Sequence, residues 1–390
     1  MTPTDITCSE FIQFTRDFFQ DGKDQLVPLH APTFGGREYE YIREALDSTF
    51  VSTAGFHVDR FAQEIRDYVG VPFVIPVVSG TAGLHLALLG VGVSPGSVVL
   101  TPALSFVATS NAIRYCQADP IFLDVEVDSL GLDPIGLEFY LNQYCERRND
   151  GGTWIKTCNK RVSACLPVHV FGNPCKTHAI KIICDNWGIP LVEDSAESFG
   201  SLEDNIHSGT IGNVGVYSFN GNKIITTGAG GAVITKDEQL AGKISHLANV
   251  SKVSIPTSFE FIHDGLGFNY KMPALNAALG LAQLEGIDKK IAAKKVIHEA
   301  YREWFEPTDV EFLIPRPATV PNHWLNAVRF ESPDQRTTWL SLTNKSGIST
   351  RPLWRPLNQY PQFEQCECMP LPQTEVLSKL IMNLPSSPNV

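Results

Sequence analysis

Several common functional motifs are missing from this sequence of 390 residues. Its nine cysteines form no CxxC pair, and Cys366 and Cys368 form a CxC that has no second pair nearby. Scattered cysteines in an odd number are typical of reduced thiols in a cytoplasmic protein and argue against a zinc site. The sequence also has no GxGxxG fingerprint and no loop ending in GKS or GKT. These absences argue against a dinucleotide oxidoreductase and a P-loop nucleotidase.

Positive charge and membrane-spanning runs are scarce as well. The net charge is −11, and the only basic cluster, Lys289, Lys290, Lys294 and Lys295, has helical spacing. We interpret it as a solvated helix face, so nucleic acid is not an expected partner. Residues 68–113 contain no charged side chain, but prolines and glycines interrupt them, so we predict buried strands and a helix there. The N-terminal segment carries acidic residues and no apolar run, so we expect neither a secretory signal nor a membrane partner.

The first two thirds of the chain alternate strand-like and helix-like runs. Strands are predicted at residues 73–78, 97–104, 120–125, 163–172, 189–194, 214–220 and 231–237, and helices at 81–92 and 176–188. Such alternation predicts an α/β fold with a mostly parallel sheet and helices on both faces. Ligands of such sheets bind at the carboxyl ends of the strands.

The pattern changes at Pro273. A long helical stretch over residues 273–305 is followed by proline-rich chain, a strand near residues 322–330, a helix, loops and a final helix. We therefore expect a large α/β domain with an N-terminal arm over residues 1–265 and a smaller α+β domain over residues 266–390.

Lys223 lies among uncharged neighbours in the segment SFNGNKIITTGAGG. A lone lysine is most often a solvated charge, but the sequence also offers other residues that could take part in binding or catalysis with this one. Asp194 and Glu197 follow a buried strand, where a carboxylate could be a core hydrogen-bond acceptor, a metal ligand or the partner of a protonated ring nitrogen. No further ligands converge with them, so we expect no metal site.

A phosphate could bind at the start of the predicted helix in VSGTAGLHLALLG. The free backbone N–H groups of Gly80 and Thr81 and the helix dipole favour an anion there, although the same pattern is also a common strand-to-helix turn. Phe106, after the next strand, could stack on a cofactor ring or pack in the core. With Ser218 and Lys223, these residues follow the chain order of one large class of pyridoxal-phosphate enzymes.

The sequence resembles the sugar aminotransferases of the DegT/StrS type, which have the aspartate-aminotransferase fold (fold type I). The segments that carry the resemblance are FVSTAGFHVDRFAQEI, VSGTAGLHLAL, TPALSFVATSNAI, PVHVFGNPC, LVEDSAESFGS, GVYSFNGNKIITTGAGG and GLGFNYKMPALNAALGLAQLE. They run from about residue 27 to the C-terminal region. The segments NGNKIITTG, NHWLNAVRF and RPLWRPLNQ resemble the branch that aminates position 4 of UDP-linked 4-keto-6-deoxy-hexoses, of the bacillosamine and legionaminic acid type.

The resemblance implies pyridoxal 5′-phosphate as the cofactor and gives roles to individual residues. Lys223 would bind the cofactor covalently and then move a proton between substrate and cofactor, and Asp194 would pair with the pyridine nitrogen. Glu197 would lie near the phenolic oxygen, although many members of the family have His or Gln there. The other implied cofactor contacts are the Gly80 and Thr81 backbone, the Phe106 ring, the Ser218 hydroxyl and Asn269, which would reach the phosphate of the other subunit of a homodimer.

The substrate side is less defined. The resemblance implies glutamate as the amino donor and a nucleotide-linked keto-sugar as the acceptor, with UDP, GDP and dTDP all compatible with the scaffold. The candidate substrate contacts are Thr53, His323, Asn326 and Trp354. A sugar dehydratase on the same fold would have His in place of Lys223, and a non-catalytic relative would have lost the lysine or Asp194.

Overall fold

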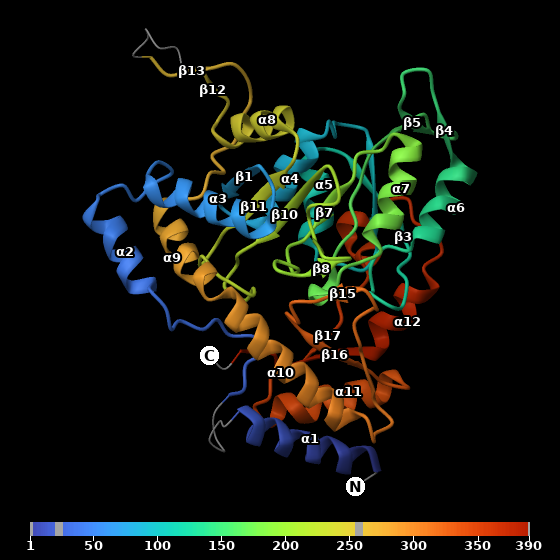
Figure 1. Cartoon of the computed structure of the whole chain (residues 1–390). Helices are drawn as coiled ribbons and strands as arrows, with labels where there is room; N and C mark the ends of the chain where they lie inside the picture. The colour runs from blue at the N-terminus through green and yellow to red at the C-terminus, as the bar shows by residue number, and fades with distance from the viewer. Residues whose placement is uncertain (1–2, 20–25, 254–259, 389–390) are drawn as a thin grey trace.

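The computed structural model describes residues 3–19, 26–253 and 260–388. Figure 1 shows a large α/β body, which carries the main sheet, and a smaller body around the C-terminal strands. Within the described ranges, no helix is both long and apolar enough to cross a lipid bilayer. The buried Cys165 and Cys184 carry free thiols.

The main sheet consists of two ladders that continue into each other. The first has the order β1 (Phe73–Val77), β11 (Gly231–Thr235), β10 (Val214–Ser218), β7 (Val192–Asp194), and the second has the order β3 (Asp119–Leu123), β2 (Val98–Pro102), β6 (Arg161–Cys165), β5 (Thr153–Ile155), β4 (Cys145–Arg147). Parallel bridges pair Cys165 with Leu191 and Val168 with Asp194, so the chain beyond β6 lies beside β7. Strands β3, β2, β6, β7 and β10 are parallel, and β11 runs against its neighbours. The predicted mostly parallel sheet is confirmed.

Helices cover both faces of this sheet, as predicted, because successive strand residues point to opposite sides. Val74 and Ile234 pack on one face, and Ile75 and Val233 pack on the other. The first face is covered by α2 (Glu38–Asp47), α3 (Phe56–Val69) and α9 (Ala274–Glu285), and the second by α4 (Gly80–Gly90), α5 (Ala108–Tyr115) and α8 (Glu238–Ala248). Helices α6 (Pro134–Tyr144) and α7 (Thr177–Trp187) pack on β2, β3 and β6. Gly188, in the left-handed region with φ 64°, ends α7.

The smaller body is an antiparallel sheet with helices. Its strand order is β14 (Glu311–Phe312), β16 (Asn326–Arg329), β18 (Ile381–Leu384), β17 (Arg351–Pro352), and its helices are α10 (Ile287–Phe305), α11 (Pro333–Lys345) and α12 (Pro372–Leu380). Strand β18 was not predicted: the sequence suggested only a final helix there, because a four-residue strand directly after a helix carries no turn signal. Shorter pairings are β8 (Leu202–Glu203) with β9 (Ile206–His207) and β15 (Thr319–Val320), and β12 (Lys252–Val253) with β13 (Ile262–His263).

The N-terminal helix α1 (Pro3–Phe19) packs on the smaller body and not on the main sheet (Figure 1). Phe11 of α1 is fully buried in one cluster with Tyr301 and Phe305 of α10 and Trp339 of α11. Helix α9, which follows residue 265, packs instead on α2 and α3 of the large body. The division of the chain into domains at residue 265 stays a prediction.

The long helical stretch predicted over residues 273–305 is two helices, because Gly286 separates α9 from α10. The interpretation of the lysine cluster as a solvated face is wrong for two of its members, since Lys290 and Lys294 are buried. Lys290 Nζ donates to Thr33 O (2.9 Å), Thr33 Oγ1 (3.1 Å) and Gln283 Oε1 (2.9 Å). Burial lowers the pKa of Lys290 to about 8. Lys290 thus links the chain at Thr33 to α10, whereas Lys294 Nζ donates to Ser386 O.

Candidate active site

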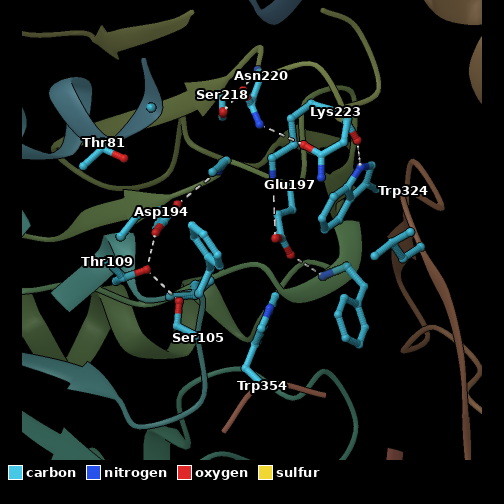
Figure 2. A pocket seen from close by; sticks show the side chains of 18 of the residues that line it. Thr81, Ser105, Thr109, Asp194, Glu197, Ser218, Asn220, Lys223, Trp324 and Trp354 are labelled. Atoms are coloured by element: carbon cyan, nitrogen blue, oxygen red, sulfur yellow. Dashed lines mark hydrogen bonds and ion pairs between the residues drawn. The ribbon is translucent and has the colours of Figure 1, made fainter. Parts of the chain in front are cut away.

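A cavity of about 690 Å³ lies at the carboxyl ends of the central strands, the edge at which the parallel sheet predicts a ligand (Figure 2). Its walls come from the β1–α4 turn, the β2–α5 loop, the ends of β7 and β10, and the segment that holds Lys223. Residues of the smaller body, including Trp324 and Trp354, close the opposite wall. The cavity therefore lies where both bodies meet.

One end of the cavity is built as an anion cradle. The Ser79 hydroxyl caps α4 by accepting the N–H of Ala82 at 3.1 Å, and the first N–H groups of the helix, at Gly80 and Thr81, have no partner within it. A Cβ at Gly80 would lie 2.9 Å from Ser218 Cβ, so only glycine lets the end of β10 approach the helix this closely. The Ser218 hydroxyl thus lies beside the positive end of the α4 dipole, an arrangement that suits a phosphate.

Asp194 places a buried carboxylate at the floor of the cavity. Its Oδ2 accepts the Thr109 hydroxyl at 2.7 Å, and its Oδ1 accepts the Ala196 N–H at 3.2 Å. Burial raises the pKa of Asp194, and the two hydrogen bonds oppose that shift. Thr109, at the start of α5, also shares a hydrogen bond of 2.6 Å with Ser105. The pair holds the carboxylate in one orientation, open to a cationic partner in the cavity (Figure 2).

Lys223 lies between a carboxylate and an aromatic face (Figure 2). Its Nζ is 3.2 Å from Glu197 Oε1 and 3.9 Å from the centroid of the Trp324 ring. Glu197 Oε2 accepts the N–H of Phe171 at 2.9 Å. Phe171 has a φ of 58° in the short 3₁₀ turn η1 (Val170–Gly172), a left-handed conformation that aims this N–H at the carboxylate. Burial raises the pKa of Glu197, and the charge of Lys223 opposes the shift.

The structure brings together most of the residues predicted to form the site. The cavity is lined by Gly80, Thr81, Phe106, Asp194, Glu197, Ser218, Lys223 and Trp354. The Phe106 ring is 56% exposed, so its side chain is available to a ligand and is not a core residue. Their roles toward a cofactor or substrate stay predictions, but their convergence means that the chain can offer them to one ligand.

Thr53, Asn269, His323 and Asn326 do not line the cavity. Asn326 Oδ1 contacts His298 Nδ1 at 2.9 Å, and the His323 ring packs against the His298 ring at a centroid distance of 4.2 Å. Burial lowers the pKa of His323 to about 3, as expected for a neutral, packed imidazole. Thr53 is half-buried in the loop before α3, and Asn269 is exposed beside Asn249, so a contact of either with a second subunit stays a prediction.

Other lining residues were not found from the sequence. Thr109 and Trp324 contact the predicted carboxylate and lysine directly, and Asn222, Arg351, Arg355 and Asn383 also line the cavity. The segment RPLWRPLNQ holds both arginines and Trp354. Its two cations around a tryptophan are the signal from which they could have been proposed.

Comparison with known proteins identifies the family to which the chain belongs. The sequence matches the DegT/DnrJ/EryC1/StrS aminotransferase family over residues 32–390. The chain belongs to this family. The chain is 35% identical over 339 residues to EpsN of Bacillus subtilis, whose name places it among pyridoxal phosphate-dependent aminotransferases, covering 87% of this chain and 84% of EpsN. It is 30% identical over 368 residues to the GDP-perosamine synthase of Vibrio cholerae, covering 94% of this chain and 95% of that protein.

Solved structures confirm the fold. DesI, solved in the presence of its TDP-sugar product, is 27% identical with a TM-score of 0.82, covering 95% of this chain and 90% of DesI. The aminotransferase TlmJ from Streptoalloteichus hindustanus is 26% identical with a TM-score of 0.83, covering 93% of both chains. The chain is thus a fold type I aminotransferase that uses pyridoxal phosphate.

The residues of the cavity fit this cofactor. The cradle of Gly80, Thr81 and Ser218 suits its phosphate, the buried Asp194 carboxylate suits its protonated ring nitrogen, and Lys223 would offer an amine to its carbonyl carbon. When bound, pyridoxal phosphate supplies a carbonyl group that accepts amines and a ring that withdraws electrons.

Proposed function

We propose that this aminotransferase transfers an amino group from glutamate to a nucleotide-linked 4-keto-6-deoxy sugar, most closely a UDP-linked one, in the synthesis of a cell-surface polysaccharide or glycan. The observation that carries the proposal is one cavity that is lined by Lys223, Asp194, an anion cradle and the arginines Arg351 and Arg355. The similarity to GDP-perosamine synthase and to DesI with its TDP-sugar product supports a nucleotide-linked sugar. The UDP preference rests on the three shorter motifs of the sequence.

The proposed roles of the protein groups follow from their positions. Lys223 takes and returns the proton at the reacting carbon, since its amine is the one flexible base in the cavity that is held beside a carboxylate. Asp194 keeps the ring nitrogen protonated, and Thr109 keeps Asp194 in place. Glu197, fixed by the Phe171 N–H, balances the charge of Lys223 whenever that amine is an ammonium.

Two arginines that line the cavity, Arg351 and Arg355, support an anionic substrate. Arg351 donates to Asn344 Oδ1 and Thr350 O, and Arg355 donates to Gln359 Oε1, so their described hydrogen-bond partners are uncharged. Within the described part of the chain, neither guanidinium has a carboxylate partner. Two cations left unpaired at the mouth of a cavity favour a diphosphate or carboxylate on the incoming substrate. Trp354 beside them offers a flat surface for a sugar or base.

The test of the function is a panel of UDP-, GDP- and dTDP-linked 4-keto-6-deoxy sugars with glutamate, with products identified by mass spectrometry and NMR. We expect an amino sugar from the wild type, and we expect Lys223→Ala to lose both the visible absorption of the bound cofactor and transamination. Lys236→Ala, which removes a lysine that donates to Thr210 O outside the cavity, is the matched control. Full transamination by Lys223→Ala, or turnover of amino acid–keto acid pairs alone, would contradict the proposal.

The two half-reactions can be separated to test the arginines. In single-turnover experiments, Arg351→Ala and Arg355→Ala should weaken binding of the nucleotide sugar, and the glutamate half-reaction shows whether the donor's carboxylates use the same cations. Arg329→Ala, which removes an arginine paired with Glu311 in the smaller sheet, is the control. Unchanged apparent affinity for both substrates in both variants would exclude the arginines as substrate contacts.

We also propose a homodimer with shared sites and a cytoplasmic location. Exposed Phe34, Phe50 and Phe56 lie near α2 and the start of α3, and Asn269 is exposed away from its own cavity. If Asn269 serves the neighbouring site, mixing inactive Lys223→Ala and Asn269→Ala chains restores activity, because one site of the hybrid is intact. No restoration in a mixture shown to form hybrid dimers would refute the shared site.

A further inference from the structure

The indole of Trp324 is held in one place against the catalytic lysine. Its Nε1–H donates to the backbone O of Asn222, the residue before Lys223, at 2.6 Å, and its own backbone N–H donates to Asn322 Oδ1 at 2.8 Å. Asn322 is fully buried and donates through Nδ2 to Glu197 O and Phe199 O, each at 2.9 Å. One network therefore fixes the tryptophan, the segment that carries Lys223 and the backbone of Glu197 relative to each other.

The contact has the geometry of a cation seat. The Lys223 Nζ lies 3.9 Å from the ring centroid, and the side chain is only 12% exposed, so water does not screen the interaction fully. A ring face attracts a cation through its quadrupole, and tryptophan gives the strongest attraction of the aromatic side chains. The hydrogen bond of the indole N–H to Asn222 O holds the ring with its face, and not its edge, toward the amine. Packing alone would not require this orientation.

Lys223 gains charge during the proposed reaction. When its free amine takes a proton from the donor's α-carbon, it becomes an ammonium. Glu197 Oε1 and the Trp324 face are then on hand to stabilise the new charge, whereas a neutral amine gains little from either. The interaction is therefore stronger after proton transfer than before, which is the condition for an effect on the rate of the chemical step.

We propose that Trp324 is a positioning residue for Lys223: its indole face seats the lysine ammonium beside Glu197 during the part of the cycle in which the lysine is not bonded to the cofactor. This inference rests on the proposed function only in that Lys223 is the proton-transfer group. It gives the smaller body a part in the chemistry, because Trp324 belongs to the segment that leads into β16.

A graded series of fluorinated tryptophans at position 324 tests the seat, because fluorine weakens the attraction of the ring for a cation while nearly keeping its size. Loss of a cation–ring contact of about 0.5–2 kcal/mol corresponds to about a 2- to 30-fold slower step. We expect the rate of the glutamate half-reaction in single turnovers to fall progressively along the series. The same analogues at Trp339, which is buried in α11, are the matched control and should leave the rate unchanged.

Two further measurements separate positioning from a purely structural role. With α-deuterated glutamate, the primary isotope effect should stay high or increase along the series, because the slowed step is proton transfer. In cofactor-free protein, Lys223 should react faster with an acetylating reagent as the ring is fluorinated, because a weaker contact with the ring holds the amine less firmly beside Glu197; peptide mass spectrometry measures this rate.

The outcomes distinguish this inference from the proposed function. A rate and an acetylation reactivity that do not change along the series, with Lys223→Ala still inactive, would overturn the role of Trp324 and leave the function standing. A decreased isotope effect with slower turnover would also overturn it, because Trp324 would then act on binding and not on proton transfer. An active Lys223→Ala variant would instead refute the proposed function.

Discussion

Replacing Thr109 by valine removes one hydroxyl beneath the cofactor site while keeping the shape of the side chain. The Thr109 hydroxyl donates to Asp194 Oδ2 at 2.7 Å, and the only other described donor to this carboxylate is the Ala196 N–H, at the longer distance of 3.2 Å. A hydrogen bond to a charged group contributes about 1.5–3 kcal/mol, which corresponds to about a 10- to 150-fold change. We therefore expect Thr109→Val to weaken cofactor binding and lower kcat/KM within that range.

The pH dependence of kcat/KM tests the same hydrogen bond, and the direction of its change follows from the pKa of Asp194. Burial already raises the pKa of Asp194, and the Thr109 hydroxyl opposes the shift, so its removal raises the pKa further. Because the ionised carboxylate is the form that pairs with a protonated ring nitrogen, the acid limb of the kcat/KM profile should move to higher pH. Thr109→Ser keeps the hydroxyl and should keep both the profile and cofactor affinity. A valine variant whose acid limb coincides with that of the wild type would refute the reasoning.

Three further substitutions test other parts of the structure. Gly80→Ala should weaken cofactor binding about 5- to 150-fold in a titration followed by absorbance, since the new methyl lies 2.9 Å from a cradle Cβ and overpacking costs about 1–3 kcal/mol; Gly242→Ala in α8, where a Cβ meets nothing within 4 Å, is the control and should not weaken it. Glu193→Gln should lower the free energy of unfolding by about 3–5 kcal/mol, because this buried carboxylate pairs with the buried His169 (Nε2 to Oε2 3.1 Å) and accepts backbone N–H groups from the loop 209–212; an unchanged melting temperature would show that neither the pair nor the loop needs the charge. Burial lowers the pKa of Lys290 from 10.5 to about 8, so the unfolded chain binds more protons between these values and the free energy of unfolding rises with pH across that window. Lys290→Met should flatten this rise in urea unfolding between pH 8 and pH 10, and an identical slope in both proteins would contradict the assignment.

The sequence predicted the site best where a recognisable strand and the site residue at its end lie in one short segment. Strands such as β1 and β7 were predictable from buried apolar runs, and the residues at or just beyond their carboxyl ends gave Asp194 and Gly80 directly. Trp324 could not be found this way, because its partner Asn222 is 102 positions away and only the packing of the smaller body brings them together. Thr109 was missed because a threonine at the start of a helix has many ordinary explanations.

The predicted residues that lie outside the cavity show a related limit. His323 and Asn326, in the segment NHWLNAVRF, were candidates for substrate contact, but their side chains contact His298 and do not line the cavity. A family resemblance conveys which segments approach a site, whereas the direction of each side chain depends on strand register. Lys290 and Lys294 show the same limit, since helical spacing alone did not reveal which face of α10 is buried.

The position of α1 has a consequence for how the chain assembles during synthesis. Phe11 leaves the ribosome before the side chains that bury it, because Tyr301, Phe305 and Trp339 are made about 300 residues later. Because domains fold in order as the chain emerges, the apolar face of α1 has to wait while the main sheet forms. A tag or truncation before residue 20 would therefore destabilise the opposite end of the chain, and a fragment that starts at residue 266 would expose the aromatic surface that α1 covers.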